Sequence, residues 1–370
     1  MSETTAAVSM LPAGFRFPTP SLRRMRRVLD WKSAVQRRRL APVRNQYFLD
    51  LWHKAAAEIG GECTQHRSGM MMIRREGVAT FVRGSELMLD TDQAKTVAGD
   101  RTMSFDMIAA RGLPVPRHMT FTKDTLDQAE QFLVELRQPV VVKPMAGTGG
   151  GRGVTTGIAC NSALRRAARY ASGYGNQILI EEEIKGASYR LTYLDGKLLD
   201  VVRRDPPTVI GNGSSTIAAL ISAENGRRRT GPRPVALSPL RLDDDMRNTM
   251  SRSGINLRTR PAVGQTVVVK GAVNENASRD NHNVSDAIHP DTVQRLRALV
   301  QDMGVRFAGV DLISEDIGRP LSDPGTVVSE VNVNPGLHHH YLISDPDRIT
   351  PVATLALEYM ISNRTGVFAL

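Results

Sequence analysis

The stretch VVKPMAGTGGGRGV, residues 141–154, decides how the chain is interpreted. Its first residues end an apolar run that is typical of a buried strand, and five of the seven residues 147–153 are glycine. A glycine-rich backbone can turn several N–H groups toward an anion, and Lys143 adds a compact positive charge. No Gly-Lys-Ser/Thr ending of a P-loop follows, and residues 154–159 read as a second strand. The stretch therefore predicts a glycine flap over phosphates, with a flexible surface hairpin as the alternative.

Strand and helix patterns alternate on both sides of this flap. Strands are expected over residues 177–182, 189–194, 197–203, 266–269, 307–313 and 326–333. Helices are expected over residues 100–110, with Asp100 as the N-cap, and over 125–136, 163–171, 216–222, 291–303 and 351–361. This order predicts an α/β or α+β architecture in which helices cover sheets.

The region before residue 100 predicts a smaller unit of its own. Apolar residues at four-residue spacing indicate a helix over 46–59, and short apolar runs on either side of residues 74–77 indicate a hairpin. Residues 1–20 carry three prolines and no apolar period, so an irregular leader is expected. Farther along, residues 226–239 combine arginines with glycines and prolines and predict an exposed loop.

Composition excludes several classes of protein. The 370 residues are 41% hydrophobic and 23% charged, which rules out fibrous and wholly disordered chains. No apolar run approaches the ~18 residues of a membrane helix, and the N-terminus lacks a signal-peptide pattern. Two cysteines cannot form a disulfide framework. These features predict a cytoplasmic protein without a membrane partner.

The net charge of +10 is concentrated in one segment. Residues 16–44 contain ten Lys or Arg residues against the single acid Asp30, so the remainder of the chain is nearly neutral. Such a segment is either a solvated helix face or an arm that binds an acidic partner. The solvated face is the preferred interpretation, and nucleic-acid binding is not expected.

A second motif, ILIEEEIKG at residues 178–186, is an apolar strand that ends in acidic residues. The backbone N–H and C=O groups at such a strand end suit the edge of an adenine ring, although the motif taken alone favours a solvated strand end with a turn at Gly186. Downstream, Arg190 lies within an expected strand, and Arg204 follows one. Arginine at these positions can hold a phosphate or a carboxylate in bidentate fashion, or form a surface salt bridge.

A third motif combines GVDLI at residues 309–313 with SEVNVNPG at residues 329–336. Residues two apart in a strand face the same side, so Glu330 and Asn332 project together, and Asp311 on a neighbouring strand can meet them. Oxygen ligands on one sheet face suit Mg²⁺. Strand-end carboxylates that point to solvent are the alternative.

The order of these motifs resembles the ATP-grasp superfamily and, more specifically, the ATP-grasp region of cyanophycin synthetase. The resemblance spans about residues 97–343 and is carried by VKP (142–144), GRGV (151–154), YRL (189–191), DGK (195–197), VIGNGSSTI (209–217), AGVD (308–311) and EVN (330–332). It implies an ATP-grasp fold with two α/β subdomains that clasp ATP, preceded by a small α/β domain. The implied units are a basic arm (1–45), the small domain (46–100) and the ATP-grasp domain (101–370), which divides into a lid (about 115–185) and a C-terminal subdomain (about 186–370).

The same resemblance implies roles for individual residues. The residues expected to bind ATP are Arg101, Lys143, Gly149, Gly150, Gly151, Arg152, Gly153, Val154, Glu181, Glu182, Glu183, Ile184 and Ser188. Among them, Arg101 stands where relatives carry lysine, and Ser188 where they often carry an acid for the ribose. Asp311, Glu330 and Asn332 match ligands of Mg²⁺, for which Mn²⁺ is an alternative. Arg190 and Arg204 match arginines that steady the transferred phosphoryl group, and Asn276 lies in the amide-forming region.

The activity implied is an ADP-forming carboxylate–amine ligase that makes an amide through an acyl phosphate. Relatives carry an Asn-x-Ser-x-Gly-Gly stretch, whereas here Asn276-Ala277-Ser278 is followed by Arg279, and the chain stops after the ATP-grasp unit. A stand-alone amino-acid or peptide ligase of specialised biosynthesis, acting as a homodimer on small molecules, is therefore expected. The alternatives are modification of a peptide or carrier-bound substrate, or a nucleotide-binding protein that recruits an acidic macromolecule through its arm.

Three consecutive histidines, residues 338–340, follow the third motif. They cannot share one strand face, which disfavours a compact metal site. A loop with solvated or satisfied imidazoles is expected, and one imidazole that deprotonates an ammonium group or binds a carboxylate is the alternative.

Overall fold

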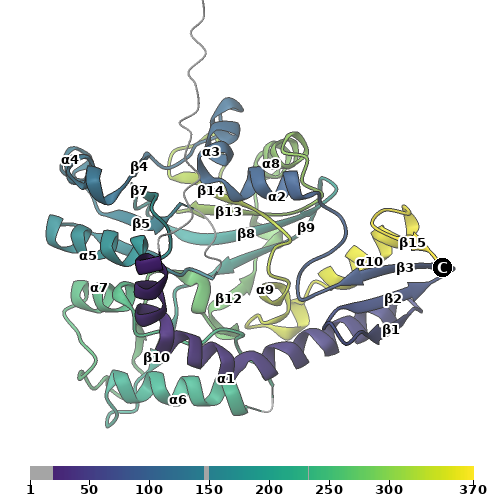
Figure 1. Cartoon of the computed structure of the whole chain (residues 1–370), viewed down its shortest axis with the longest axis horizontal. Helices are drawn as coiled ribbons and strands as arrows, with labels where there is room; N and C mark the ends of the chain where they lie inside the picture. The colour runs from purple at the N-terminus through teal and green to yellow at the C-terminus, as the bar shows by residue number, and fades with distance from the viewer. Residues whose placement is uncertain (1–19, 146–149, 232) are drawn as a thin grey trace, which may run out of the picture.

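The longest element is one helix, α1 (Pro20–Glu58), which runs along the lower edge of the molecule in Figure 1. The computed structural model describes residues 20–145, 150–231 and 233–370, with the backbone alone for residues 20–33. The helix predicted over 46–59 is confirmed in type, but it begins at Pro20 and includes part of the basic arm. Arginine, leucine and alanine favour helix, so the arm residues extend it even through Pro42. The predicted leader lies, up to residue 19, outside the described residues.

Next to α1 lies a four-stranded antiparallel sheet in the order β1-β2-β3-β15. Its strands are β1 (Glu62–Gln65), β2 (Met71–Arg75), β3 (Val78–Val82) and β15 (Phe368–Ala369). The predicted hairpin is confirmed, and its turn places Glu76 and Gly77 at positive φ. The sheet, α1 and α10 (Val352–Ser362) enclose one core around Trp52, Ile73 and Leu357. The C-terminal elements therefore complete the N-terminal unit (Figure 1).

A second four-stranded antiparallel sheet, in the order β4-β7-β5-β6, contains the glycine flap. Its strands are β4 (His118–Phe121), β5 (Val140–Pro144), β6 (Thr155–Ile158) and β7 (Ile178–Glu182). The apolar faces of α4 (Leu126–Leu136) and α5 (Asn161–Ser172) pack on it through Leu133, Val142 and Leu164. The prediction that the flap joins two strands is confirmed, because β5 and β6 pair with each other.

The central sheet has five antiparallel strands in the order β12-β9-β8-β13-β14. They are β8 (Ala187–Leu194), β9 (Lys197–Arg204), β12 (Asn281–Asn283), β13 (Phe307–Ser314) and β14 (Thr326–Val333). One core joins the sheet to α2 (Asp92–Gly99), α3 (Arg101–Ala110) and α8 (Pro290–Asp302). Asp100 caps α3 as predicted, accepting hydrogen bonds from the backbone N–H groups of Thr102 and Met103.

Between β9 and β12 the chain forms a smaller unit from β10 (Thr208–Ile210), β11 (Thr266–Val268), α6 (Ile217–Thr230) and α7 (Asp244–Arg252). The prediction of an exposed loop over 226–239 is wrong at its start, because α6 continues to Thr230. The side chain of Arg228 is buried and donates hydrogen bonds to Glu224 and to the carbonyls of Ser238 and Glu275. These bonds compensate the buried charge and extend the helix past Gly226.

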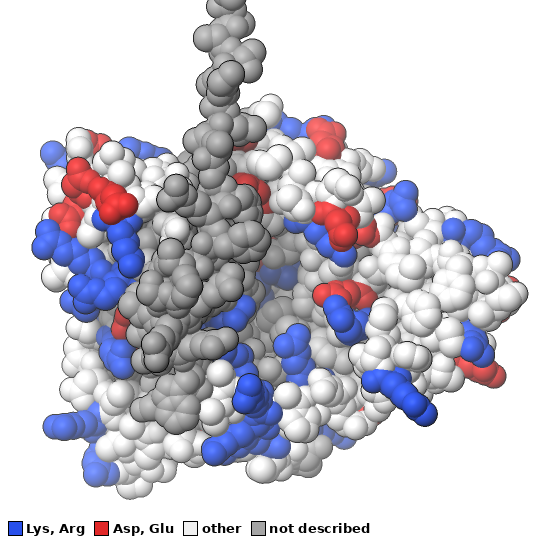
Figure 2. All heavy atoms as spheres, in the orientation of Figure 1, with Lys and Arg blue, Asp and Glu red and all other residues white. Residues whose placement is uncertain are grey.

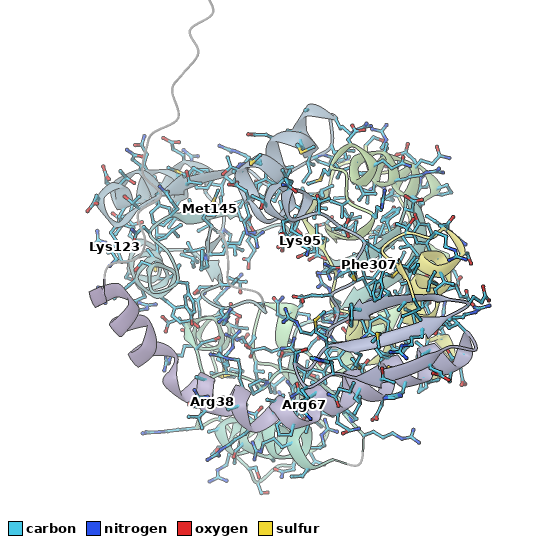
Figure 3. The ribbon with its side chains drawn as sticks, turned by 45° about the vertical axis from the view of Figure 1, so that its right-hand side comes forward. Arg38, Arg67, Lys95, Lys123, Met145 and Phe307 are labelled. Carbon is cyan, nitrogen blue, oxygen red and sulfur yellow. The ribbon has the colours of Figure 1, made fainter. Side chains whose placement is uncertain are left out.

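The predicted α/β architecture is confirmed, since helices cover the five-stranded central sheet and the four-stranded sheet that contains the flap. Figure 3 shows the two sheets on opposite sides of the view, with Met145 just after β5 and Phe307 at the start of β13. No helix in the described part of the chain is both long and apolar enough to span a membrane. These two sheets carry most of the residues to which the sequence assigned chemistry.

Candidate active site

A row of charged residues crosses the central sheet from strand to strand. On β14, β13 and β8 the register places Glu330 opposite Asp311 and Asp311 opposite Arg190. Residues opposite each other in antiparallel strands share a face and lie about 5 Å apart. The structure thus brings together the expected metal ligands and one of the expected catalytic arginines.

Asp311 is the centre of this row and is enclosed by two arginines. Nη2 of Arg190 lies 2.9 Å from one carboxylate oxygen, and Nη2 of Arg204 lies 3.0 Å from the other. All three residues are buried, and their side chains are 10% exposed or less. Burial raises the pKa of the Asp311 carboxyl, but Arg190 and Arg204 outweigh it and hold that pKa below its ordinary value. The carboxylate is therefore ionised and charge-compensated.

The backbone of β13 makes room for this arrangement at Gly309. A Cβ atom there would lie 2.6 Å from Cβ of Pro335 and 2.9 Å from Cδ of Arg190. Only glycine allows the Asn-Pro-Gly turn after β14 to pack against the stem of Arg190. The glycine in the AGVD motif thus positions the arginine and that turn together.

Arg101, the first residue of α3, lies between the two sheets. Its Nη2 donates a hydrogen bond of 3.1 Å to Oε1 of Glu330, and its pKa is also affected by Glu181 and Asp311. Nη1 of Arg101 is buried and has no partner among the described residues. The Arg101 guanidinium therefore interacts with acidic residues of both sheets, and its Nη1 is available to donate a further hydrogen bond.

On the flap sheet, Lys143 of β5 pairs with Glu181 of β7. Lys143 Nζ lies 2.6 Å from Glu181 Oε1, and both side chains are buried. Burial lowers the pKa of Lys143, and nearby Arg101 lowers it further, against the opposing effect of Glu181 and Glu330. Arg101, Lys143, Glu181 and Glu330 therefore form one electrostatic unit that spans both sheets.

The residues at the strand end that is expected to bind adenine differ in whether their backbone groups are already hydrogen-bonded. The N–H groups of Glu182 and Glu183 are bonded to the carbonyls of Arg117 and Pro139, and their side chains face Gln138 and Arg252. Ile184, the next residue, is half-buried, and in the described part of the chain its N–H and C=O have no hydrogen-bond partner. Of the four hinge residues, Ile184 has the backbone groups free to pair with a base.

Only part of the flap can be placed, since Gly149 lies outside the described residues. The carbonyl of Gly150 accepts a hydrogen bond of 2.8 Å from Arg241. Gly151 has a φ of +66°, and a Cβ there would lie 2.8 Å from Oδ1 of Asn274. Arg152, Gly153 and Val154 complete the turn into β6. The described end of the flap, Gly150 and Gly151, thus lies against Arg241 and Asn274.

The structure also shows the contacts of Ser188 and Asn276, two further residues that are expected in the site. The hydroxyl of Ser188 accepts a hydrogen bond of 2.9 Å from Arg204, so it positions an arginine of the charged row. Asn276 is buried outside that row, and its amide donates to Asn281 Oδ1 at 2.7 Å and to the carbonyl of Asp205 at 3.2 Å. Its side chain holds two chain segments together beside a pocket.

The donor set of the charged row fits Mg²⁺. Asp311 and Glu330 offer carboxylates, and the Asn332 amide lies 3.5 Å from Asp311. Among the described residues no group of three or more His, Cys, Asp or Glu side chains could hold a metal ion. Two carboxylates and an amide are a set that Mg²⁺ completes with phosphate oxygens and water. The residues present therefore suit a cation that arrives with a nucleotide.

A buried polar network behind the flap was not expected from the sequence. Lys270 bonds to Asp243 at 2.6 Å and lies 3.2 Å from Glu275, and Arg241 also pairs with Glu275. One feature of the sequence could have indicated it. VVVK occurs at residues 140–143 and again at residues 267–270, and in both places a lysine follows three valines that are typical of a buried strand. The network connects the flap contact of Arg241 to the core of the smaller unit.

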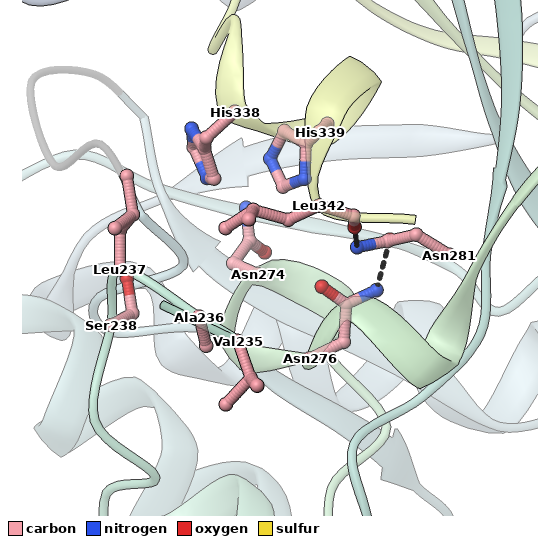
Figure 4. Close-up of a pocket in the computed structure, with 10 residues that line it drawn as sticks. All are labelled: Val235, Ala236, Leu237, Ser238, Asn274, Asn276, Asn281, His338, His339 and Leu342. Atoms are coloured by element: carbon pink, nitrogen blue, oxygen red, sulfur yellow. Dashed lines mark hydrogen bonds between the residues drawn. The ribbon is translucent and has the colours of Figure 1, made fainter. Parts of the chain in front are cut away.

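The three histidines occupy a short helix, α9 (His338–Tyr341), instead of a loop. His340 is satisfied as expected, with Nδ1 2.6 Å from Asp200 and Nε2 2.8 Å from Thr192. His338 and His339 instead line a pocket, and Nδ1 of each is buried without a partner among the described residues (Figure 4). Burial, with help from nearby arginines, lowers the pKa of His338 to about 3 and that of His339 well below its ordinary value.

The rest of this pocket is formed by amides and small side chains. Its lining consists of Val235, Ala236, Leu237, Ser238, Asn274, Asn276, Asn281, His338, His339 and Leu342. Figure 2 shows one face of the molecule, where basic side chains gather along the lower left. The pocket lining contains no acidic residue.

Comparison with known proteins shows what the chain is similar to. Residues 107–205 match the family described as D-ala D-ala ligase C-terminus. Cyanophycin synthetase of Trichormus variabilis is 31% identical over 263 residues, which are 70% of this chain and 28% of that protein. The glutathione biosynthesis bifunctional protein GshAB of Streptococcus mutans is 27% identical over 84% of this chain and 39% of its own length. The chain thus spans well under half the length of these relatives.

Solved structures give weaker likenesses. A bifunctional glutathione synthetase from Pasteurella multocida has a TM-score of 0.49 at 19% identity, covering 80% of this chain and 40% of that one. A D-alanine–D-alanine ligase from Bacillus anthracis has a TM-score of 0.43 at 13% identity, covering 74% and 70%. The sequence comparisons carry more weight: the chain is similar to the C-terminal domain of D-ala D-ala ligase over residues 107–205 and to cyanophycin synthetase over 70% of its length, as expected for an ATP-grasp ligase.

Proposed function

We propose that the chain is an ADP-forming ligase that joins a carboxylate to an amine through an acyl phosphate. The observation that carries this proposal is the buried pair of arginines around Asp311, in register with Glu330 and next to Arg101 and Lys143. Phosphoryl transfer needs positioning and charge neutralisation more than covalent help, and this cluster offers both.

The proposed reaction has two steps. A carboxylate oxygen attacks the γ-phosphorus of ATP, the bond to the bridging oxygen breaks, and ADP leaves. The amine nitrogen then attacks the acyl carbon, the carbon–oxygen bond breaks, phosphate leaves with the electron pair, and the nitrogen loses a proton. Arg190 and Arg204 steady the transferred group, and Lys143 and Arg101 hold phosphates of the nucleotide. Asp311, Glu330 and Asn332 would hold Mg²⁺, which supplies charge neutralisation.

The flap and the strand end complete the nucleotide site in this proposal. Residues 149–154 cover the phosphates and exclude water, which protects an acyl phosphate from hydrolysis. Ile184 pairs with adenine through its free backbone groups, and Ser188 acts through Arg204. We place the enzyme in the cytoplasm as a homodimer of specialised biosynthesis, with amino acids or similar small molecules as substrates. Similarity to cyanophycin synthetase and GshAB supports the amino-acid class.

ADP release with MgATP, measured against twenty amino acids singly and in pairs, tests this function. We expect ADP that depends on a pair, and loss of that activity in Glu330→Ala. The matched control is Glu135→Ala, since Glu135 is an exposed glutamate on α4 whose side chain accepts a hydrogen bond from Gln131. ATP turnover that ignores both amino acids and the Glu330 substitution would contradict the proposal.

A peptide-modifying enzyme is the second candidate, favoured by the exposed Arg38, Arg39 and Arg44 on α1. Charge reversal at these three arginines separates the two candidates. In the charge-reversed variant, ligation of small substrates would persist, whereas modification of an acidic peptide would be lost. In the wild-type protein, modification of such a peptide would depend strongly on salt.

A further inference from the structure

The helix α7 of the smaller unit lies along the free edge of the flap sheet. In the order β4-β7-β5-β6 the strand β6 is at the edge, and α7 packs against it. Asp245, Asn248 and Arg252 recur at spacings of three and four residues, so they share one face of α7. Another face carries buried methionines of the core of the smaller unit. The polar face is therefore the one available for contacts with the flap sheet.

Asp245 and Asn248 bond to the backbone of β6. The carboxylate of Asp245 accepts hydrogen bonds from the N–H of Thr156 at 2.9 Å and from the Thr156 hydroxyl at 2.7 Å. Nδ2 of Asn248 donates to the carbonyls of Thr156 and Gly157, to the second of them at 3.0 Å. Asp245 is fully buried, so its charge depends on such bonds. The side chains of α7 thus occupy the position that a further strand would occupy beside β6.

Arg252 extends these contacts to the end of β7, where adenine is proposed to bind. Its Nη1 lies 3.2 Å from a carboxylate oxygen of Glu183, the residue before Ile184. The same side chain lies against Gly157, where a Cβ atom would be 2.7 Å from Cδ of Arg252. Gly157 also has a φ of +67°, which favours glycine. One arginine therefore contacts both β6 and the strand end of β7.

The residue that leads into α7 from the other side, Arg241, contacts the chain ahead of β6. Its Nη2 donates a hydrogen bond of 2.8 Å to the carbonyl of Gly150. Arg241 pairs with Glu275, which lies 3.2 Å from Lys270, and all three residues are 4% exposed or less. Residues 241–252 therefore contact the flap sheet before β6, along β6 and at the end of β7.

We propose that Asn248 and Arg252 are positioning residues for the nucleotide, which fix β6 and the strand end of β7 relative to each other and thereby set the affinity for MgATP. This role rests on the proposed function, in which the chain just before β6 covers the phosphates and Ile184 pairs with adenine. Two surfaces that must contact one ligand together bind it more weakly when each has to be ordered first. Neither positioning side chain has to touch the nucleotide.

Calorimetric titration with Mg²⁺ and a non-hydrolysable ATP analogue tests this role without turnover. Arg252→Leu removes the ion pair with Glu183 at a side chain that is 48% exposed, so this variant should fold. Asn248→Leu removes both bonds to the carbonyls of β6. We expect each variant to bind the analogue at least tenfold more weakly than wild type.

Two further variants serve as the rescue and the control. Only Nη1 of Arg252 contacts Glu183, so a lysine ammonium can replace it, and Arg252→Lys should recover most of the lost affinity. Arg247→Leu places the same new residue on the opposite face of α7, at a side chain that is 65% exposed, and should bind as wild type does. Equal affinities in wild type and all variants would overturn the proposal.

Hydrogen exchange of the peptide over residues 155–159, measured by mass spectrometry, reports on β6 itself. We expect the N–H of Thr156 to exchange at least tenfold faster in Asn248→Leu than in wild type, and at the wild-type rate in Arg247→Leu. A purely structural role of α7 would be to cover an edge strand. Faster exchange with unchanged affinity for the analogue would establish that role and overturn the proposed one.

Trapping with hydroxylamine separates a failure of this role from a failure of the ligase. Wild-type protein with MgATP, amino acids and hydroxylamine forms a hydroxamate if an acyl phosphate is made. Binding of the analogue without hydroxamate contradicts the ligase, and weaker binding by the variants still supports the positioning role. Hydroxamate formation with equal affinities contradicts the positioning role alone. Wild-type protein that does not bind the analogue contradicts both.

Discussion

Gly309 leaves the space in which Pro335 and the Arg190 side chain lie next to the backbone of β13. Gly309→Ala would place a methyl group 2.6 Å from Pro335 and 2.9 Å from Arg190, and one of them must move. Displacing a positioned group lowers kcat/KM by roughly tenfold to a hundredfold. We expect that loss in the ADP-release assay, with a decrease of about 1–3 kcal/mol in the free energy of unfolding.

Gly226→Ala is the matched control for this substitution. Gly226 lies within α6, and a Cβ there would meet no atom within 4 Å. Alanine favours helix over glycine by about 1 kcal/mol, so this variant should be as active as wild type and slightly more stable. Equal activity of the two variants would show that Gly309 does not position Arg190.

Because the pKa of His338 is lowered in the folded state, its titration should decrease the free energy of unfolding as the pH falls. Burial lowers its pKa to about 3, below the ~6.5 of an unfolded chain, so the unfolded state binds a proton first as pH falls. Stability attributable to His338 is complete above about pH 6.5 and declines below it by about 1.4 kcal/mol per pH unit. Urea unfolding between pH 7 and 5 measures this slope, which His338→Asn should reduce. An unchanged slope in the variant would mean that the imidazole titrates normally.

At the scale of elements, α6 depends on one buried arginine. Arg228 bonds to Glu224 and to the carbonyls of Ser238 and Glu275, so it fastens the segment that forms one pocket wall. Removing one partner of a buried pair costs roughly 3 kcal/mol, which we expect for Arg228→Met in urea unfolding. Arg227→Met, at an exposed position that also pairs with Glu224, should cost less than about 1 kcal/mol. Similar losses in both variants would contradict this account.

The elements show what the sequence could and could not predict. Period-two spacing placed Glu330 and Asn332 on one face, because that alternation is a local property of a strand. The pairing of Asp311 with Arg190 depends on the register of strands that are 121 residues apart, which no local pattern contains. The prediction ended the helix α6 too early, because a local signal was present but pointed to the wrong structure. Local glycine and proline signals favoured a loop, and the tertiary contacts of Arg228 outweighed them.

The same limit applies to the histidines. One of them, His340, is satisfied as expected. The free Nδ1 atoms of His338 and His339 depend on how α9 packs, so they became visible only in the structure.

At the scale of the whole molecule, the two ends of the described chain share one core. Leu357 of α10 and Trp52 of α1 are both fully buried in the cluster that also contains β2 and β3. Leu357→Ala should lower the free energy of unfolding by roughly 2–5 kcal/mol. Trp31→Phe leaves Trp52 as the remaining tryptophan. Its fluorescence should show the same shift of the urea transition as the loss of helical circular dichroism. Val134→Ala, at a position that is 64% exposed, is the control. A shifted transition without any change at Trp52 would show that the ends fold separately.

Transfer of oxygen from a substrate carboxylate to phosphate tests the central claim most directly. Wild-type protein is incubated with MgATP and amino acids labelled with ¹⁸O in the carboxyl group, and the released phosphate is analysed by mass spectrometry. Because the carboxylate oxygen stays with phosphorus when the amide forms, the account predicts phosphate with one ¹⁸O atom per ADP, and none from Glu330→Ala. Unlabelled phosphate alone would mean that water attacks ATP, and it would contradict the assignment of the charged row to carboxylate activation.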